Sequence, residues 1–276
     1  MSYPSRHWAE LCTRDFAEAR DSGLAARTVA VLPVAAIEQH GPHLPLNVDA
    51  ALLHGVIDAA LALLPADLPL LLLPQQAIGL STEHLSYPGT LSLAPETVLA
   101  LWGEIGAAVA RAGISKLLLL NSHGGNVAPM DIAARTLRQR HDLLVYRCSW
   151  FDLPLPAAVE NLFSAEEHRF GIHAGAIETS MMLHLAPHLV RMEHARDWHS
   201  SSQDRAARHA ILGNGKSAKM GWAIEDYNAS GAVGNAPSAS ADKGAQVVQA
   251  AAKALAQLLL ELHALAPDTL ARRPQA

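Results

Sequence analysis

Two carboxylates and two imidazoles lie close together in residues 38–49, which read Glu-Gln-His-Gly-Pro-His-Leu-Pro-Leu-Asn-Val-Asp. They belong to Glu38, His40, His43 and Asp49. Because Gly41, Pro42 and Pro45 prevent regular structure, these groups are expected on a stiff loop. Imidazole nitrogens and carboxylate oxygens bind divalent metal ions. We therefore interpret the stretch as a metal-binding loop; the alternative is a polar surface turn.

A second motif, Asn-Ser-His-Gly-Gly-Asn, occupies residues 121–126. Its imidazole, His123, is a further candidate metal ligand. Gly124 and Gly125 lack a Cβ, so the backbone there can approach a ligand closely, and both are candidate substrate contacts. A phosphate-binding turn is the alternative. The motif, however, has neither the Gly-x-Gly-x-x-Gly spacing nor a Walker lysine, which argues against nucleotide binding.

A third motif begins at His173 and opens a helix that is expected to stop near Pro187. Glu178 lies in this helix among apolar residues. An unpaired buried carboxylate costs several kcal/mol, so a buried Glu178 requires a cation. The alternative is that Glu178 lies on a partly exposed face of the helix.

The apolar runs predict the elements that position these residues. We expect strands at residues 28–37, 68–74, 116–120 and 143–149. We expect helices at residues 7–20, 50–64, 95–112, 126–140, 173–187 and 242–265, and fraying after Pro267. Strands that alternate with helices indicate βαβ units, hence an α/β fold with a mostly parallel sheet covered by helices on both faces. With no internal repeat or linker, residues 1–276 are predicted to form one domain.

The candidate residues follow strands or begin helices. Ligands of open parallel sheets bind beyond the carboxyl ends of the strands, so these residues are expected to converge there. Asp49 has an alternative role as the cap of the helix at 50–64. In the loop at 75–88, Glu83 and His84 are either supporting groups around this site or solvated side chains.

Mixed histidine and carboxylate ligands without thiolates suit zinc, manganese or iron, and zinc is the commonest. Three carboxylates exceed what one zinc ion normally takes. Two divalent metal ions that share a bridging aspartate fit better, and such a pair can activate a hydroxide and polarise a carbonyl.

Composition excludes several other classes of protein. Among 276 residues, Lys and Arg number 21 against 26 Asp and Glu, a net charge of −5 that does not favour a nucleic-acid partner. Two distant cysteines, Cys12 and Cys148, exclude a disulfide framework and a thiolate zinc site. No signal peptide is visible, and the apolar runs are too interrupted to cross a membrane. We expect a cytoplasmic protein without a membrane partner.

Taken together, the three motifs resemble the creatininase (creatinine amidohydrolase) family. The resemblance extends to Pro88-Gly89-Thr90 and to the Gly234, Pro237 and Gly244 segment, and so covers nearly the whole chain. It implies a three-layer α/β/α fold, hydrolysis of amide or cyclic-amide C–N bonds of a small molecule, two metal ions and a homo-oligomer, commonly a hexamer.

The resemblance also implies a role for each residue. Glu38 and His123 would bind one metal, His40 the other, and Asp49 would bridge them. His173 would carry a proton to the leaving nitrogen, a role that suits an imidazole because its unperturbed pKa lies near neutrality.

The chain departs from the creatinine-hydrolysing enzymes in two places. They have a glutamate ligand where this chain has Gly125, and Glu178 is our candidate for the missing carboxylate. They have a tryptophan a few residues before the proton-carrying histidine, and residues 166–171 contain none. Both departures make creatinine itself a doubtful substrate.

Other parts of the chain are candidates for contact with the substrate. Trp150 is a candidate pocket wall, with a core position as the alternative, and Arg169 is a candidate partner for a substrate carboxylate. Residues 153–172 are predicted to form an irregular lid, and residues 221–243 a loop that covers the substrate.

Three alternative functions remain open. The His-Gly-Gly-Asn turn resembles relatives that act on formamides or short peptides, such as the mycofactocin-precursor peptidase. The third alternative is a non-catalytic metal- or ligand-binding protein on the same fold.

Overall fold

Four parallel strands form the central sheet of the computed structural model, which describes residues 2–266 and 269–270. Their bounds are Val29–Val34 (β1), Leu70–Leu72 (β2), Lys116–Asn121 (β3) and Leu144–Ser149 (β4). The order across the sheet is β2-β1-β3-β4, and every neighbouring pair is parallel. A parallel pair needs a long crossover connection. Helices supply it here, as the alternation of apolar runs predicts.

The side chains of the strands point alternately to two hydrophobic cores. On β3, Leu118 and Leu120 join one core, while Leu117 and Leu119 join the other. All four are almost fully buried. Successive side chains of a strand face opposite sides of a sheet, so a strand buried on both faces is apolar throughout. This explains why the strands appear in the sequence as unbroken apolar runs.

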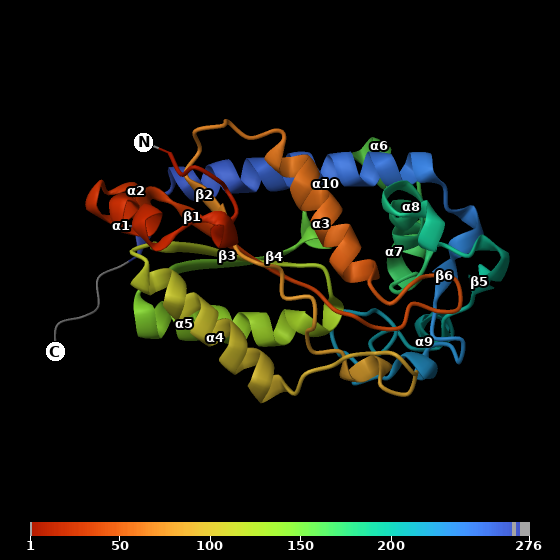
Figure 1. The fold of residues 1–276 in the computed structure, drawn as a ribbon. Coiled ribbons are helices and arrows are strands. Elements are labelled where there is room, and N and C mark those ends of the chain that lie inside the picture. The colour runs from red at the N-terminus through yellow and green to blue at the C-terminus, as the bar shows by residue number, and fades with distance from the viewer. Residues whose placement is uncertain (1, 267–268, 271–276) are drawn as a thin grey trace.

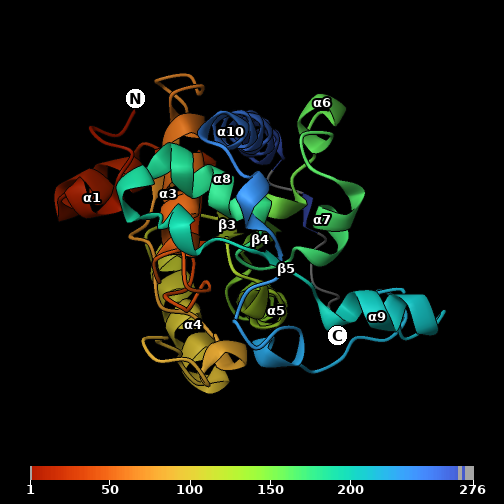
Figure 2. The ribbon, with the colours of Figure 1, turned by 90° about the vertical axis from the view of Figure 1, so that its right-hand side faces the viewer.

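Helices cover both faces of the sheet (Figure 1). The first core packs against α3 (Val48–Leu61), α8 (Ala176–Leu185) and α10 (Ala241–Ala264). The second packs against α1 (Thr13–Asp21), α2 (Leu24–Arg27), α4 (Pro95–Arg111) and α5 (Val127–His141). Figure 2 looks along α10, with α10 on one side of the strands and α5 on the other. The expected three-layer α/β/α architecture is confirmed.

Several predicted boundaries shift. The helix expected from residue 7 begins at Thr13, after a 3-10 turn at Trp8–Glu10 (η1). The strand expected to reach residue 37 ends at Val34, where its pairing with β3 ends. The irregular region at 153–172 contains two short helices, α6 (Ala157–Glu160) and α7 (Ala165–Phe170). The expected fraying after Pro267 falls largely outside the described residues.

A smaller set of elements follows α8. These are β5 (Asp197–Trp198), α9 (Ser201–Arg208) and β6 (Gly234–Asn235), with 3-10 turns at Pro187–Leu189 (η5), Met192–His194 (η6), Ile224–Asp226 (η7) and Ala236–Ser238 (η8). β5 and β6 pair antiparallel. Among the described helices, none is both long and apolar enough to cross a membrane.

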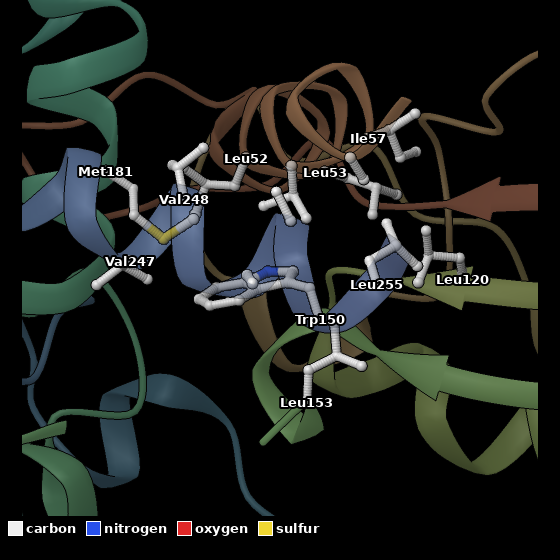
Figure 3. Packing of buried hydrophobic residues seen from close by; sticks show 14 of the residues in the cluster. Leu52, Leu53, Ile57, Leu120, Trp150, Leu153, Met181, Val247, Val248 and Leu255 are labelled. Atoms are coloured by element: carbon white, nitrogen blue, oxygen red, sulfur yellow. The ribbon is translucent and has the colours of Figure 1, made fainter. Parts of the chain in front are cut away.

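Three strands end at the same level of the sheet. Val34 is in register with Asn121, and Asn121 with Ser149. The segments that leave β1, β3 and β4 therefore start side by side. Trp150 follows directly on β4 and packs into the core that includes Leu53 of α3 and Val248 of α10 (Figure 3).

Candidate active site

The loop after β1 holds Glu38 and His40 in the interior, where they are 1% and 0% exposed. The backbone N–H of Glu38 donates to the carbonyl of Leu46 at 2.9 Å, which closes the loop on itself. Gly41 has φ 66°, and a Cβ there would lie under 3.0 Å from Ala232. Glycine fits this turn easily because it tolerates a positive φ and has no Cβ to meet Ala232.

Asp49 lies in the first turn of α3 and does not cap the helix. Asn47 occupies the N-cap position, and no side chain caps the first turn. Asp49 Oδ1 is 3.7 Å from His40 Nε2, and Asp49 Oδ2 is 3.3 Å from His123 Nδ1. The carboxylate thus lies between two imidazoles, and the capping alternative does not describe it.

His123 turns one ring nitrogen toward two carboxylates. Its Nε2 lies 2.8 Å from the carbonyl oxygen of Leu80 and 3.3 Å from Glu83 Oε1. A carbonyl oxygen only accepts, so Nε2 carries a hydrogen. Nδ1 then faces Glu38 Oε2 at 3.2 Å and Asp49 Oδ2 at 3.3 Å. A nitrogen lone pair against two carboxylates is repulsive unless a proton or a metal ion lies between them.

A second set of donors surrounds His40. Its Nδ1 is 3.1 Å from the backbone carbonyl of Glu38, and its Nε2 faces Asp49 Oδ1 at 3.7 Å and Glu178 Oε2 at 4.0 Å. Both His40 Nε2 and Asp49 Oδ2 are buried without a hydrogen-bond partner among the described residues. Leaving such atoms unpaired is costly. The residues present therefore fit divalent cations.

The electrostatics of the cluster also favour positive charge. Burial raises the pKa of Glu38, but the charge of His123, the hydrogen bond with His123 and the charge of His84 together outweigh burial and lower that pKa to about 2. Burial lowers the pKa of His40, yet Asp49 raises it to about 9. The pKa of His123 lies well above 6.5, because Glu38 and Asp49 overcome the effect of burial. In the metal-free protein these imidazoles hold protons, which metal ions would displace on binding.

His173 has the opposite electrostatic environment. Its Nε2 donates to the carbonyl of Gln39 at 2.8 Å, so Nδ1 is left as the acceptor, 3.8 Å from Glu38 Oε1. Burial lowers the pKa of His173 well below 6.5, and positive charge on His40 and His84 lowers it further. His173 is therefore neutral and able to accept a proton.

The turn after His173 directs Glu178 toward His40. Ala174 has φ 57°, in the left-handed region that non-glycine residues rarely adopt. Its backbone N–H donates to Glu178 Oε2 at 2.5 Å. Burial raises the pKa of Glu178 to about 7. The Glu178 side chain is 20% exposed and lines the cavity described below. The alternative of a partly exposed helix face therefore describes its exposure, although its carboxylate faces His40.

His84 is more deeply buried than the sequence indicates. It is 1% exposed, and its ring stacks on His173 with centroids 4.2 Å apart. The amide of Gln39 donates to His84 Nδ1 at 2.8 Å, and His84 Nε2 lies 3.3 Å from Glu38 Oε1. His84 is therefore a supporting group around the site and not a solvated side chain. Its position in the loop after β2, near the carboxyl edge of the sheet, was the available signal.

A cavity of about 400 Å³ opens onto these residues. Of the predicted site residues, it is lined by Glu38, Asp49, His123, Gly124, Trp150, His173 and Glu178. His40 lies below this lining, fully buried. The apolar wall includes Phe151, Ile172 and Trp222. The sequence did not single out these three residues individually, although Trp222 belongs to the expected covering loop and Ile172 to the expected lid at residues 153–172.

Two predicted residues lie elsewhere. Arg169 donates to the carbonyl of Gly213 at 2.9 Å and stacks on Phe170, outside the cavity lining. Gly125 does not line the cavity either, and a Cβ there would lie under 3.0 Å from Leu80 O and His123 Nε2. A side chain at this position has no room, so Gly125 supplies tight packing behind His123.

Comparison with known sequences identifies relatives along most of the chain. A family model described as "Creatininase: Creatinine amidohydrolase" matches residues 9–259. The mycofactocin precursor peptide peptidase of Mycobacterium tuberculosis H37Rv is 35% identical over 173 residues, which are 60% of this chain and 62% of the relative. The creatinine amidohydrolase of Pseudomonas putida is 33% identical over 186 residues, 63% of this chain and 70% of that protein. The alignment thus spans less than two thirds of the peptidase's length.

Comparison with solved structures covers more of the chain. A glutamate-to-glutamine mutant of creatininase in a Zn–Zn form superposes with a TM-score of 0.74. It is 27% identical and covers 95% of this chain and 99% of its own. The arrangement of elements is therefore shared over nearly the full length.

Proposed function

Because this chain belongs to the creatininase family, we propose that it is a metal-dependent amidohydrolase that cleaves a C–N amide or cyclic-amide bond of a small molecule. The observation that carries the proposal is the position of the Asp49 carboxylate. One oxygen faces His123 and the other faces His40. A carboxylate placed in this way is suited to bridge two cations.

The chain offers two ligand sets that share Asp49. One consists of Glu38, His123 Nδ1 and Asp49 Oδ2, and the other of His40 Nε2, Glu178 Oε2 and Asp49 Oδ1. Histidine nitrogens and carboxylate oxygens suit zinc, with manganese or iron as further candidates. When bound, two such ions supply an activated water and polarise the carbonyl to be cleaved.

Protein groups around the ions complete the site. The Leu80 carbonyl and Glu83 hold the far nitrogen of His123, which orients the ring and raises its basicity as a ligand. The Gln39 amide holds His84 in place beside Glu38. These contacts keep the donor atoms aimed before any metal arrives, which reduces the cost of binding.

His173 is the proposed proton carrier. Its Nε2–H is fixed by the Gln39 carbonyl, so Nδ1 is free to take a proton from the attacking water and to deliver it to the leaving nitrogen. Its low pKa keeps this nitrogen unprotonated at neutral pH. Trp222, Ile172 and Phe151 form an apolar wall of the same cavity.

A peptidase that trims a short peptide is the second candidate. The peptidase relative is slightly more similar in sequence than the creatinine amidohydrolase over the aligned parts. Gly125 also leaves no room for a ligand side chain, which separates this site from that expected of the creatinine-hydrolysing enzymes. A formamide deformylase also fits the lack of room for a ligand side chain at Gly125.

A hydrolysis screen of the zinc- and manganese-loaded protein tests the proposal. The panel contains creatinine, cyclic ureas, formamides and short peptides, and the H173A variant and chelator-treated protein serve as controls. The amidohydrolase is supported if the metal-loaded protein hydrolyses at least one class of substrate and the two controls do not. If metal analysis finds no tightly bound ions, a non-catalytic protein is favoured.

The proposal extends to assembly and location. We expect a homo-oligomer, a hexamer by resemblance, located in the cytoplasm. β4 is an edge strand, and its Tyr146 is 43% exposed, which suits a contact with another subunit. Light scattering on the purified protein and fractionation of the producing cells check these two expectations.

A further inference from the structure

Glu167 of α7 is a buried carboxylate that contacts backbone rather than a charged side chain. It is 5% exposed. Its Oε1 accepts the N–H of Ala176 at 2.5 Å, and its Oε2 accepts the N–H of Asn235 at 2.8 Å. The carboxylate thereby joins the first turn of α8 to β6, two segments far apart in the chain.

Three glycines make room for this carboxylate. A Cβ at Gly171, Gly175 or Gly234 would lie under 3.0 Å from the Glu167 side chain. Gly175 and Gly234 lie on the two segments that Glu167 joins, and Gly171 directly follows α7. A larger residue at any of the three would displace the carboxylate. The three glycines and the two backbone N–H donors thus enclose the carboxylate of Glu167 within the fold.

His173 lies within residues 171–176, the turn between α7 and α8 that Glu167 contacts at Ala176. The carbonyl of His173 accepts the N–H of Val233 at 3.0 Å, next to β6. Ala174 follows with φ 57°, a conformation that persists only where surrounding contacts impose it. Glu167 supplies one such contact at Ala176. The direction of the His173 ring and the contact between Ala174 and Glu178 both depend on this turn.

We propose that Glu167 is a positioning residue whose carboxylate holds residues 171–176 against β6 and thereby aims His173 and Glu178 at the centre of the site. The roles of His173 and Glu178 rest on the proposed function, whereas the holding of the turn does not. Two hydrogen bonds to an ionised acceptor are stronger than neutral ones, and both donors are backbone groups of the held segments.

The E167Q variant tests the proposal with little change of volume. A glutamine offers one acceptor oxygen, so one of the two backbone N–H groups must face an amide N–H₂ group. E166Q is the matched control, since Glu166 is the neighbouring residue and its carboxylate accepts an exposed contact from Gln203.

Hydrogen exchange of the metal-free, full-length protein gives a readout independent of activity. We expect at least tenfold faster amide exchange in peptides that cover residues 171–178 and 233–235 of E167Q, and no change in those of β1 and β3. E166Q should match the wild type throughout. Unchanged exchange at 171–178, or an equal increase in the central strands, would overturn the proposal.

Cobalt(II) binding gives a second readout. In E167Q we expect a changed visible spectrum of the bound cobalt and at least tenfold weaker affinity for the ion next to Glu178. If the wild type binds no cobalt, the proposed metal centre fails while the exchange experiment still decides the role of Glu167.

The G171A variant tests the same contact by changing a residue that encloses the Glu167 carboxylate rather than Glu167 itself. Gly171 has φ −82°, which alanine adopts without strain, so its only expected effect is to displace the Glu167 carboxylate. It should reproduce the exchange pattern of E167Q. If both variants fail to fold, Glu167 stabilises the whole fold rather than one turn, and the positioning role is refuted.

Discussion

Asp49 and His123 meet through Oδ2 and Nδ1 at 3.3 Å, although they come from different segments, the start of α3 and the turn after β3. The other ring nitrogen of His123 is held by the Leu80 carbonyl. Neither group can turn away, because both are almost completely buried. This pair defines the orientation of the proposed metal centre.

The D49N variant should lose metal. An amide cannot bridge two cations as a carboxylate does, so the metal content is expected to fall from about two ions per chain to one or none. Elemental analysis after dialysis measures this. D58N is the control on the same helix, since Asp58 is exposed and pairs only with His54 in the described structure. Equal metal content in D49N and the wild type would contradict the bridging role.

The H173A variant should keep its metal and lose turnover. Removing a positioned proton carrier lowers kcat by about 10²- to 10⁴-fold. Steady-state kinetics on the substrate found by the screen, together with metal analysis, measures both effects. H54A is the control, because His54 is exposed on α3. Metal loss in H173A would instead make His173 a ligand.

The E178Q variant separates the two proposed ligand sets. Glu178 faces His40 and not His123, so only the ion of the His40 set should be weakened. Titration of the chelator-treated protein with zinc should show one site of unchanged affinity and one at least tenfold weaker. Weakening of both sites to the same extent would argue against separate ligand sets.

The G125A variant should lower the free energy of unfolding. A Cβ there would collide with the Leu80 carbonyl and the His123 ring, and such overpacking costs about 1–3 kcal/mol. Denaturant unfolding measures the change. G124A is the control in the same turn, because a Cβ at Gly124 meets nothing within 4 Å. A stability loss in G124A as large as that in G125A would show that the turn itself, rather than the collision, is responsible.

His43 should make the metal-free protein less stable at low pH. Burial lowers its pKa from 6.5 to about 4, and positive charge on His40 contributes. Between these values the unfolded chain binds a proton that the folded chain does not. Above pH 6.5 His43 therefore does not lower the free energy of unfolding. As the pH falls from 6.5 toward 4, that free energy declines by about 3 kcal/mol in total, at 1.36 kcal/mol per pKa unit.

The H43Q variant tests this expectation. Unfolding of the metal-free variant between pH 4 and 7 should show a flatter dependence of the free energy of unfolding on pH than the wild type. Glutamine can still pair with Thr179 Oγ1, the partner of His43 Nε2 at 2.8 Å, and it does not titrate. Identical slopes in the two proteins would assign the pH dependence to other groups.

The strands and their helical connections were readable from the sequence, since a strand buried on both faces must be apolar throughout. The predicted position of Glu38, His40 and His123 after strand ends follows from the same pattern. Local pattern could not place strand ends or short helices, because tertiary pairing decides them. Thus β1 ends at Val34, where its partner β3 ends.

The sequence by itself determined which chemical groups are available and in what succession strands and helices follow along the chain. Residue type and periodicity are local properties, so both can be read without the fold. Only the tertiary structure decided which atoms meet. It placed His84 against Glu38 and removed Arg169 from the cavity. It also enclosed Glu167 among three glycines. Such contacts join segments distant in sequence, and their distances depend on packing that no local pattern records.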